Sequence, residues 1–516
     1  MTAHRVGRAR IRAFSADGSK VAVCNVTVIM IPVTSFELNT EKISGSVGTQ
    51  YQLAAENILP LQATYSTIEW ESDHPQVATV DENGLITMNH AGMAVISAYA
   101  DEGRFVDKCL VIVNGDEESV PDVEYLTPQD YRRVNEVDDT ESFNRAFRRL
   151  SDDCNTVFVP EGIYRIDADI AIRPKNNTNL IMSPKAVLIA KDSSDTHYDV
   201  IYVRDVSNVS ISGGTIIGER YGHDGSDGEW GMGIGIYDST NISVSDVDIS
   251  DCWGDGIYVG SKRDNELDAG SSYVSISDCY LHNNRRNNMS IVCVDNIEVD
   301  GCRFENANGT APQYGIDIET NNSKNPCEHI RISNCTFTGN KEAALGIVRE
   351  ANDIELINCT LNGLFVNWNG TNVKLSGCTL NGEMAARYGV TLMDGTVIND
   401  GGSKEDVLVA TYDTDVQITQ KSGKYINLKD FKGGMTVLKS GARYRFEYVV
   451  KGSGQWDFVT NQTGWYSVCP VEDDYFTCYT TYRAKSASEC KLHFYADNFT
   501  SGSKLIIDSI KIYEVK

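Results

Sequence analysis

Four acidic residues between positions 229 and 319 lie beside glycine-rich strand segments. Asp255 is in "DCWGDGIYVG", Asp317 and Glu319 are in "QYGIDIETN", and Glu229 is in "HDGSDGEWGMG". Hydrolysis of a glycosidic bond needs two carboxyl groups, one to protonate the leaving oxygen and one to activate water or attack. Carboxylates that lie close together raise one another's pKa, which keeps one of them protonated near neutral pH. The four residues therefore predict a glycosidase site, with Asp317 and Asp255 as the first choice of pair.

Side chains that could hold a sugar lie close to these acids in the sequence. Exposed indole rings provide flat apolar platforms, and arginine or asparagine binds hydroxyl and carboxylate groups. Each residue type also has a simpler role: tryptophan is often buried, an aspartate at a strand corner often bonds backbone, and a loop histidine is usually solvated. The predicted substrate-binding residues are Trp230, Trp253, His223, Arg285, Arg286, Asn287 and Tyr314, with His223 as a residue that could orient an acid.

The acids fall within a repeated strand pattern. Short alternating strands recur every 19 to 33 residues, and a second set of strands starts near residues 233, 256, 288, 315 and 345. Alternation with a recurring period of this length predicts a right-handed parallel β-helix, in which each coil pairs with the next about 4.8 Å along the axis. The first set of strands starts at Val209, Ile242, Val274, Ile297, Ile330, Ile354 and Val373. Carboxylates at equivalent points of neighbouring coils would then share one lateral groove.

A column of cysteines follows the same period. We expect these thiols to face inward as small apolar groups, because side chains stacked one coil apart cannot all be paired as disulfides. The column is Cys279, Cys302, Cys335, Cys359 and Cys378, and the apolar residues two positions later are Leu281, Phe304, Phe337, Leu361 and Leu380.

The region before the repeats resembles the bacterial immunoglobulin-like (Ig-like) group 2 domain. The residues that carry this resemblance are Trp70, Ser72, Ala78, Val80, Gly84, Leu85, Gly92, Ala94, Ile96 and Ala98. We assign residues 30–114 to this domain, residues 1–29 to the end of a preceding copy, and residues 115–136 to a linker. The resemblance implies a spacer or display role without chemistry.

The solenoid is predicted to cover residues 137–400. It begins with an amphipathic helix that carries Phe143, Ala146 and Phe147 at helical spacing. This segment resembles the entry of the pectate-lyase superfamily, where such a helix covers the open end of the β-helix. A cap is physically required there, because an open end would expose core and unpaired strand edges.

Residues 206–320 resemble the polygalacturonase family and its β-helical relatives, including tailspike depolymerases. The segment from Trp253 to Ile257, "WGDGI", is similar to the strand opening that carries the first catalytic aspartate of polygalacturonases. Asn287 and Asn288 replace that family's Asp-Asp pair, and its Gly-His-Gly and Arg-Ile-Lys motifs are absent. The tailspike arrangement, with acids from neighbouring coils or loops, suits the four carboxylates better.

Two alternatives stay open. A polysaccharide lyase would use Arg285 or Arg286 as base, although arginine is a poor base, and would need calcium. The calcium ligands would come from "HDGSDGE" or from "DNELDAG", which contains Asp264, Glu266 and Asp268. A non-catalytic adhesin or phage receptor-binding spike would explain the flanking domains but not the clustered acids. For the hydrolase we predict no metal or other cofactor.

Residues 401–516 predict a C-terminal jelly-roll β-sandwich that resembles a carbohydrate-binding module. Trp456, Trp465 and Tyr466 are its candidates for sugar stacking, because they fall in turn-like segments. The fold class as a whole is therefore all-β, with the β-helix between an Ig-like sandwich and this module.

Composition limits the partners and the location. The 516 residues carry a formal net charge of −26 and no basic run, which argues against nucleic acid as a partner. No apolar run is long enough for a membrane span, and the basic start lacks the apolar segment of a signal peptide. We expect a fragment of a larger exported protein or another route of export, a polysaccharide as partner, and an extracellular, cell-surface or virion location. The sequence leaves the oligomeric state open, a trimer included.

Overall fold

A computed structural model describes most of residues 5–515, and the chain divides into two compact units that are treated separately. The first unit contains residues 1–118, 129–142 and 160–164, and the second contains residues 119–128, 143–159 and 165–516. The segments outside the description are residues 1–4, 64–66, 101–103, 116–119, 262–269, 322–326, 383, 387–389, 394, 400–406, 420–423, 428–437, 454–455, 461–464, 469–475, 485–490, 497–503 and 516.

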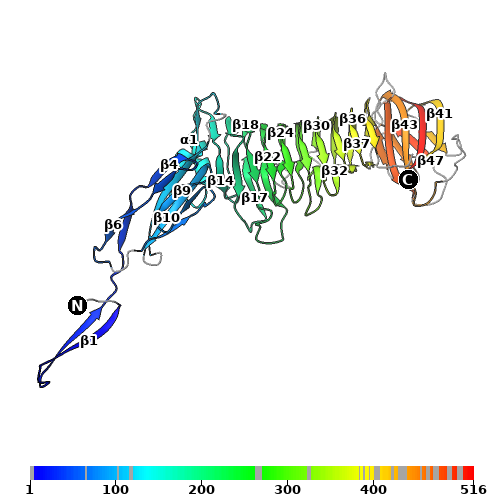
Figure 1. The fold of residues 1–516 in the computed structure, drawn as a ribbon. Coiled ribbons are helices and arrows are strands. Elements are labelled where there is room, and N and C mark those ends of the chain that lie inside the picture. The colour runs from blue at the N-terminus through cyan, green and yellow to red at the C-terminus, as the bar shows by residue number, and fades with distance from the viewer. Residues whose placement is uncertain are drawn as a thin grey trace. The chain divides into compact units, whose positions relative to one another are not determined.

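The first unit holds a separate hairpin and an Ig-like sandwich whose strands pair antiparallel except for β4 and β11, which pair in parallel (Figure 1). The hairpin is β1 (Gly7–Phe14) with β2 (Val21–Val28). The sandwich strands are β3 (Ser35–Leu38), β4 (Lys42–Ser46), β5 (Gln50–Gln52), β6 (Ala55–Leu59), β7 (Glu69–Ser72), β8 (Ala78–Val80), β9 (Leu85–Met88), β10 (Gly92–Ala100) and β11 (Phe105–Asn114). Alternating apolar residues of β10 and β11 enter a core with Leu53, Val77 and Ile86.

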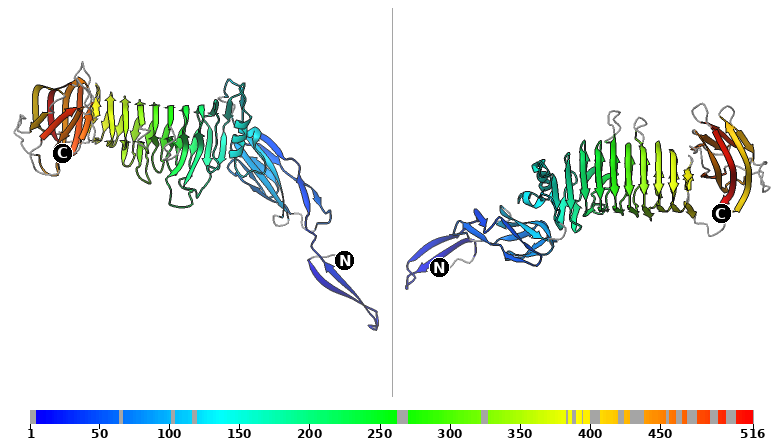
Figure 2. Two further views of the ribbon diagram at one scale, coloured as in Figure 1. Left: turned by 180° about the vertical axis from the view of Figure 1, so that it is seen from behind. Right: turned by 90° about the horizontal axis from the view of Figure 1, so that it is seen from above.

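The second unit is dominated by three parallel sheets. Each sheet takes one strand from each of the successive coils, which Figure 2 shows. The first sheet is β12 (Tyr125–Leu126), β13 (Thr156–Val159), β15 (Thr178–Met182), β18 (Ser207–Ser212), β21 (Thr240–Ser245), β24 (Ser271–Ser277), β27 (Val294–Asp300), β30 (Cys327–Ser333), β33 (Ala351–Ile357), β36 (Gly370–Ser376) and β39 (Val390–Leu392). The second is β16 (Ala186–Ala190), β19 (Thr215–Ile217), β22 (Asp248–Ser250), β25 (Tyr280–His282), β28 (Arg303–Glu305), β31 (Thr336–Thr338), β34 (Thr360–Asn362), β37 (Thr379–Asn381) and β40 (Val397–Asn399). The third is β17 (His197–Arg204), β20 (Trp230–Tyr237), β23 (Ile257–Gly260), β26 (Met289–Val292), β29 (Tyr314–Glu319), β32 (Ala343–Ile347), β35 (Phe365–Asn367) and β38 (Met384–Ala386).

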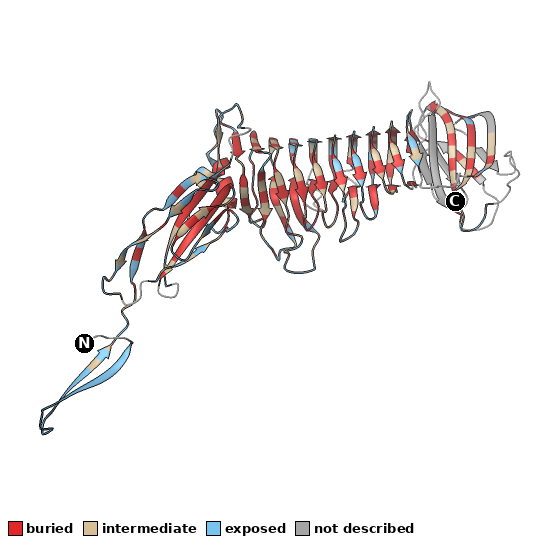
Figure 3. Cartoon of the chain, in the orientation of Figure 1, coloured by how far each residue is buried: buried red, intermediate tan, exposed pale blue. Residues whose placement is uncertain are grey.

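The predicted columns of the solenoid are confirmed. In the second sheet Leu281 pairs with Phe304 and Phe304 with Phe337, whose rings stack 5.0 Å apart. All five column cysteines are free and buried, so they pack as small apolar groups. Figure 3 shows buried residues alternating along the coils. The inward row of each sheet is therefore continuous from coil to coil.

Asparagine ladders hold the corners between the sheets. Asn208 and Asn241 adopt the left-handed conformation, with φ of 58° and 56°, which asparagine tolerates better than most residues. The amide of Asn241 donates to Asn208 and that of Asn208 to Asn177, each at 2.6 Å. These hydrogen bonds thus connect the same corner in successive coils.

The predicted entry helix is present as α1 (Thr140–Arg149), after the short helix η1 (Pro128–Tyr131) and before β14 (Gly162–Ile166). Phe143 and Phe147 are buried, as the helical spacing predicts. Within the second unit, Asn144 donates to the Ala171 carbonyl at 2.9 Å and accepts from the Arg173 amide at 2.9 Å. The helix therefore contacts the first coils directly.

The C-terminal strands form two antiparallel sheets with a shared aromatic core. They are β41 (Val407–Thr419), β42 (Lys424–Asn427), β43 (Arg443–Ser453), β44 (Trp456–Thr460), β45 (Trp465–Val468), β46 (Phe476–Arg483), β47 (Lys491–Ala496) and β48 (Lys504–Val515). Trp456 is completely buried in the core with Phe446 and Phe494. The prediction that Trp456 is a sugar platform in a turn is therefore wrong. Trp465 and Tyr466 lie in strand β45 rather than in a turn, and their side chains are outside the description.

Candidate active site

The site occupies the outward face of the third sheet. Strand alternation sends Ile257, Met289 and Ile316 into the core and leaves the neighbouring positions outside. Register aligns Tyr258 with Ser290, and Ser290 with Asp317, on three successive coils. The chemistry-bearing residues therefore sit in one column because each strand repeats the same inward and outward order.

Arg286 lies at the centre of the predicted acids. Its guanidinium contacts Asp255 Oδ2 at 2.8 Å, Glu229 Oε2 at 3.6 Å and Glu319 Oε1 at 3.8 Å. The fourth acid, Asp317, contacts the residue next to Arg286: the side-chain amide of Asn287 donates to Asp317 Oδ2 at 3.5 Å. The fold thus brings together four acids that are far apart in the sequence, since Glu229 and Glu319 are separated by 90 positions.

Asp255 is enclosed and its oxygens are occupied. Its side chain is 0% exposed. Oδ2 accepts from Arg286 and from the Ser290 hydroxyl at 2.6 Å, and Oδ1 accepts from the Asn287 backbone amide at 2.9 Å. These contacts suit a carboxylate that holds Arg286 in place.

Asp317 is nearly enclosed, but one of its oxygens is free among the described residues. Oδ1 has no hydrogen-bond partner there, and the residue is 3% exposed. Burial first, and then the nearby Glu319 carboxylate, raise the pKa of Asp317 to about 7, against the opposing effect of Arg286. Asp317 therefore holds a proton at a higher pH than an ordinary aspartate does.

Asn287 and Tyr314 support this centre. Asn287 is fully buried, which corrects the prediction that it contacts substrate. Its side-chain oxygen accepts from the Tyr314 amide at 2.9 Å, so it connects two coils. The Tyr314 ring lies over Gly346, where an added Cβ would come within 2.5 Å of the ring. A glycine at 346 is needed for the ring to lie there.

A cavity of about 810 Å³ lies on the same sheet face, and of the four acids Glu319 lines it. Arg286 and Glu319 line it together with Trp230, His197 and Tyr258. Trp230 is 43% exposed, and its ring stacks on His197 at 4.4 Å and 20°. This indole is therefore exposed and supported by a stacked ring, beside Arg286 and Glu319 in the cavity lining.

Aromatic rings continue the cavity toward earlier coils. Tyr237 stacks on Tyr258 with ring centres 5.3 Å apart, and Tyr202 lies 5.4 Å from Tyr237. The Tyr237 hydroxyl donates to Asp199 Oδ1 at 2.9 Å, and burial raises the pKa of Tyr237 well above its usual value. Flat rings on three successive coils give an extended lining that a chain of sugar rings would fit.

Three predicted binding residues instead fix the loop before β20. Trp253 is only 7% exposed and lies between the His223 ring at 3.8 Å and the Arg285 guanidinium at 3.6 Å. Arg285 also donates to the carbonyls of Gly228 and Trp253 at 3.0 and 3.2 Å. Trp253 is therefore not an open sugar platform, because both of its faces are covered.

His223 bonds a buried acid outside the predicted set. Its Nδ1 lies 3.0 Å from Glu219 Oε1. Burial, with the nearby Asp192 carboxylate, raises the pKa of Glu219 to about 8, and burial lowers the pKa of His223. His223 thus contacts an acid, as the sequence suggested, but that acid is Glu219 and not one of the four candidate carboxyls.

Sequence reasoning missed Ser290, His197 and Glu219. Ser290 could have been found, because it occupies the same strand position as Asp317 one coil earlier. His197 pairs directly with Trp230, so the same comparison one coil back would have found it. Glu219 gave no signal, since a buried acid between strands has no distinguishing sequence pattern.

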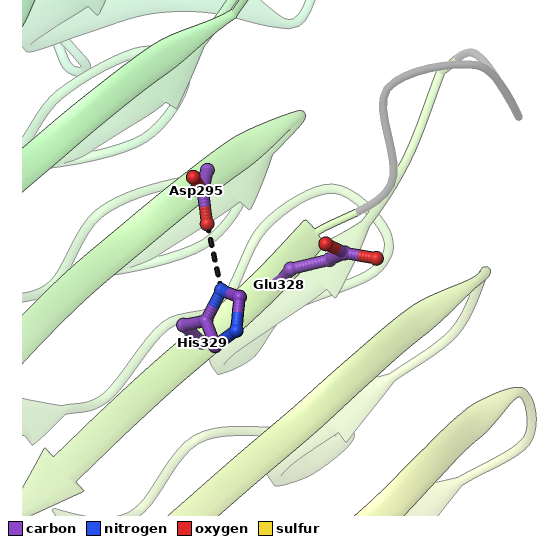
Figure 4. A group of neighbouring side chains, drawn as sticks. All are labelled: Asp295, Glu328 and His329. Carbon is purple, nitrogen blue, oxygen red and sulfur yellow. Dashed lines mark hydrogen bonds and ion pairs between the residues drawn. The ribbon is translucent and has the colours of Figure 1, made fainter.

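A second group of possible ligands lies on the neighbouring strands β27 and β30 of the first sheet, as Figure 4 shows. The ligand atoms of Asp295, Glu328 and His329 lie within 4.8 Å of one another. His329 adopts a left-handed corner conformation, and its Nδ1 lies 2.8 Å from Asp295 Oδ1, which raises the pKa of His329. This bond between coils is the same device as the asparagine ladders, so the group needs no metal to explain it. "DNELDAG", a possible calcium segment, lies outside the described residues apart from Gly270.

Two family models match this chain. The model of the right-handed β-helix region matches residues 170–361 and 232–400, and that of the group 2 bacterial Ig-like domain matches residues 32–111. The chain is a right-handed parallel β-helix protein with a group 2 bacterial Ig-like domain. The predicted all-β fold class is thereby confirmed for this β-helix protein.

The curated relatives of this β-helix protein are uncharacterised. YclG of Bacillus subtilis strain 168 is 37% identical over 210 residues, which is 36% of either chain. The SPbeta prophage-derived protein YorA of the same strain is 29% identical over 343 residues, covering 60% of this chain and 54% of YorA. The chain spans about half the length, or less, of the curated relatives it matches.

Solved structures with a similar arrangement include proteins of several kinds. The capsular polysaccharide depolymerase tailspike gp49 of Acinetobacter baumannii bacteriophage Fri1 is 11% identical with a TM-score of 0.34, over 86% of this chain and 97% of gp49. The Streptococcus pneumoniae adhesin PfbA is 10% identical with a TM-score of 0.30, over 54% and 90%. Among the described residues, no helix is long and apolar enough to cross a bilayer.

Proposed function

We propose that this β-helix protein is an extracellular or virion-associated glycoside hydrolase that cleaves a polysaccharide bound along the third sheet. The observation that carries the proposal is Asp317, a nearly buried carboxyl whose pKa is raised to about 7, two residues from Glu319 at a large cavity. Perturbed carboxyls beside a cavity are candidates for acid and base catalysis.

Asp317 is the proposed general acid. A carboxyl with a pKa near the working pH can both hold and give up a proton, which is the requirement for protonating a glycosidic oxygen. Its free Oδ1 supplies the donor atom, because Oδ2 already accepts from Asn287. Burial first, and then the neighbouring acids, raise the pKa of Asp317 toward neutral pH.

Glu319 is the proposed second carboxylate. It lines the cavity and lies on the same face of β29 as Asp317, about 7 Å away along the strand. Arg286 and Arg349 contact its two oxygens at 3.8 and 3.6 Å.

Asp255 is assigned a positioning role in this proposal, in place of the acid or base role that the sequence favoured. It fixes Arg286, which faces Glu229 and Glu319 as well. A guanidinium held in this way can bind sugar hydroxyls and balance the charge of the acids.

The cavity lining supports a polysaccharide as substrate. Trp230 offers an exposed ring beside the acids, and Tyr258, Tyr237 and Tyr202 continue along successive coils about 4.8 Å apart. Aromatic faces suit the apolar faces of sugar rings, and an extended lining suits a polymer better than a small molecule.

A lyase receives less support from the same geometry. Arg286 is held by three carboxylates, which raise its pKa, so it is a poorer base than a free arginine. Arg285 has a lowered pKa, but its guanidinium packs on Trp253 and bonds loop carbonyls.

The test is digestion of a panel of bacterial and plant polysaccharides by the full chain. New reducing ends and the ultraviolet absorbance of unsaturated uronates would be followed together. The proposal expects reducing ends without absorbance, lost in Asp317→Asn and Glu319→Gln. The matched control is Glu298→Gln, an exposed glutamate on β27 of the first sheet, which should cleave normally.

Two results would contradict the proposal. Absorbance that appears with the reducing ends would indicate a lyase. Binding without cleavage of any glycan would indicate an adhesin.

A further inference from the structure

Two arginines on the early coils of the solenoid are held by one tyrosine. The guanidinium of Arg173 lies over the Tyr202 ring, 4.5 Å from its centre. The Tyr202 hydroxyl accepts from Arg204 Nη1 at 3.1 Å. A single aromatic side chain thus brings two cationic groups to the same point of the third sheet.

The repeat fixes how far this point lies from the acids. Arg204 ends β17, and Ile172 forms a parallel bridge to Ile201 of that strand, so Arg173 lies on the preceding coil. Glu319 ends β29, which is the fourth strand after β17 in the third sheet. At about 4.8 Å per coil, Arg204 therefore lies about 19 Å along the axis from Glu319.

Both arginines line a cavity of about 350 Å³, together with Pro174, Tyr202 and Asp205. Arg173 and Tyr202 also line the cavity of about 810 Å³ that Glu319 lines. Because the two cavities share these walls, a chain of sugars bound along the aromatic lining would reach the arginines.

Arg173 has no acidic partner among the described residues. Its Nε donates to the Ile170 carbonyl at 2.9 Å, and its two terminal nitrogens have no hydrogen bond or ion pair to any residue that the structure describes. The Tyr202 ring and the Ile170 carbonyl therefore fix this guanidinium and leave its outer donors available.

Arg204 has one carboxylate partner, and that partner is exposed. Asp205 Oδ2 lies 3.2 Å from Arg204 Nε, and the Asp205 side chain is 69% exposed. Ion pairs at such exposure contribute little. The lining of the smaller cavity thus has two arginines against one aspartate, a local excess of positive charge in a chain with a net charge of −26.

This arrangement suits an anion better than a neutral sugar. The guanidinium group matches carboxylate, sulfate and phosphate oxygens with pairs of charge-assisted hydrogen bonds. Two guanidinium groups held by one ring are also ordered before a ligand binds, which lowers the entropy cost of binding.

We propose that Arg173 and Arg204 form a subsite for an acidic group of the polysaccharide, either a carboxylate or a sulfate or phosphate ester. The inference rests on the proposed function and makes its substrate an anionic polysaccharide. The sugar that carries the acidic group binds about 19 Å, or four coils, from Glu319.

Arginine footprinting of the full chain tests the subsite. Phenylglyoxal modifies accessible guanidinium groups, and mass spectrometry follows each arginine separately. The probes are polygalacturonate, hyaluronan and alginate, each also with its carboxyl groups reduced to alcohols, then dextran sulfate with dextran, and inorganic sulfate alone. Asp317→Asn serves as a second sample in which cleavage does not remove the polymer.

We expect an acidic polymer to slow the modification of Arg173 about tenfold, whereas its neutral counterpart does not. Arg331, half-exposed on β30 of the first sheet, is the internal reference and should react at an unchanged rate. The reduced uronates and the dextran pair show whether the bound group is a carboxylate or a sulfate ester.

Matched variants separate this subsite from a general effect of charge. Arg173→Gln and Arg204→Gln should each weaken binding of the acidic polymer about tenfold, to the level of its neutral counterpart, as measured by calorimetry. Arg331→Gln makes the same change of charge on the first sheet and should bind normally.

Three results would overturn the proposal: equal protection of Arg173 by acidic and neutral polymers, an equal loss of binding in Arg331→Gln, and protection by inorganic sulfate but by no polymer. Cleavage confined to neutral glycans would contradict this subsite and leave the hydrolase in place. Binding of an acidic polymer that needs both arginines, without cleavage, would support the subsite and contradict the hydrolase.

Discussion

Asp255 and Arg286 join two neighbouring coils through a 2.8 Å ion pair that is almost closed to solvent, with side chains 0% and 11% exposed. Arg286 also contacts Glu229 and Glu319. The ion pair with Asp255 therefore fixes the position of a guanidinium group that two further acids contact. Removing one partner of a buried pair is costly, because the other charge is left without compensation.

Asp255→Asn should therefore weaken both the fold of the solenoid and the activity. We expect a loss of about 3 kcal/mol in the free energy of unfolding, measured with urea. Because the Asp255 charge raises the pKa of Asp317, the variant should also lower that pKa. The falling limb of its pH–rate profile should move to lower pH, a shift that a merely structural role of Asp255 would not produce.

The activity of the unaltered protein should fall as the pH rises through about 7. Asp317 must be protonated to act as the acid, and its pKa is raised to about 7 mainly by burial. Measurement of kcat/KM between pH 5 and pH 9 checks this, with Glu298→Gln as the control. A rate that rises across this range would contradict the assignment of Asp317 as general acid.

Asp317 should also make the fold less stable as the pH rises. Its pKa is about 7 in the folded state, against the ordinary aspartate value of 3.8 in the unfolded chain, so the folded state binds the extra proton between pH 3.8 and about 7. Stability is greatest below pH 3.8 for this group and declines up to about 7. Asp317→Asn should remove the decline and stabilise the protein at pH 8 by on the order of 4 kcal/mol, while cleavage falls about 10²- to 10⁴-fold. Urea unfolding at pH 5 and pH 8 separates the two effects.

Periodicity predicted most of the solenoid because its coils repeat one local rule. Ile257, Met289 and Ile316 mark the inward row, and the residues between them define the outward face. The four acids were found because they fall near this row. Their roles could not be predicted, since the enclosure of Asp255 and the free oxygen of Asp317 depend on contacts between coils.

The tryptophans show the limit of reasoning from residue type. Trp230 and Trp253 both lie beside glycine, yet one is exposed and the other is covered on both faces. Only the path of the loop from Glu219 to Glu229 distinguishes them. Trp456 differs from its predicted role for a similar reason. Its surroundings in the sequence are typical of a turn, but it lies in strand β44 with its side chain buried in the core.

Trp230→Ala should weaken substrate binding with little effect on the acids. Loss of a stacking ring should raise KM about tenfold and change kcat by less. Tyr273→Ala, at an exposed corner of the first sheet, is the control and should leave KM unchanged. Equal KM values for the Trp230 variant and the unaltered protein would remove this ring from the binding groove.

Trp253→Ala should act through the loop instead of through direct contact with sugar. The indole fills the space between His223 and Arg285, and Arg285 in turn holds the Gly228 carbonyl next to Glu229. Without the ring, residues 223–229 lose their anchor, so limited proteolysis should cut this loop faster. Glu229 and Trp230 would then lose their fixed position beside Arg286, which lowers kcat as well as affinity. Trp253→Phe keeps a flat ring between the same two partners and should recover most of the protease resistance and activity. If the alanine variant kept a protected loop but lost sugar binding alone, Trp253 would have to be a sugar platform after all.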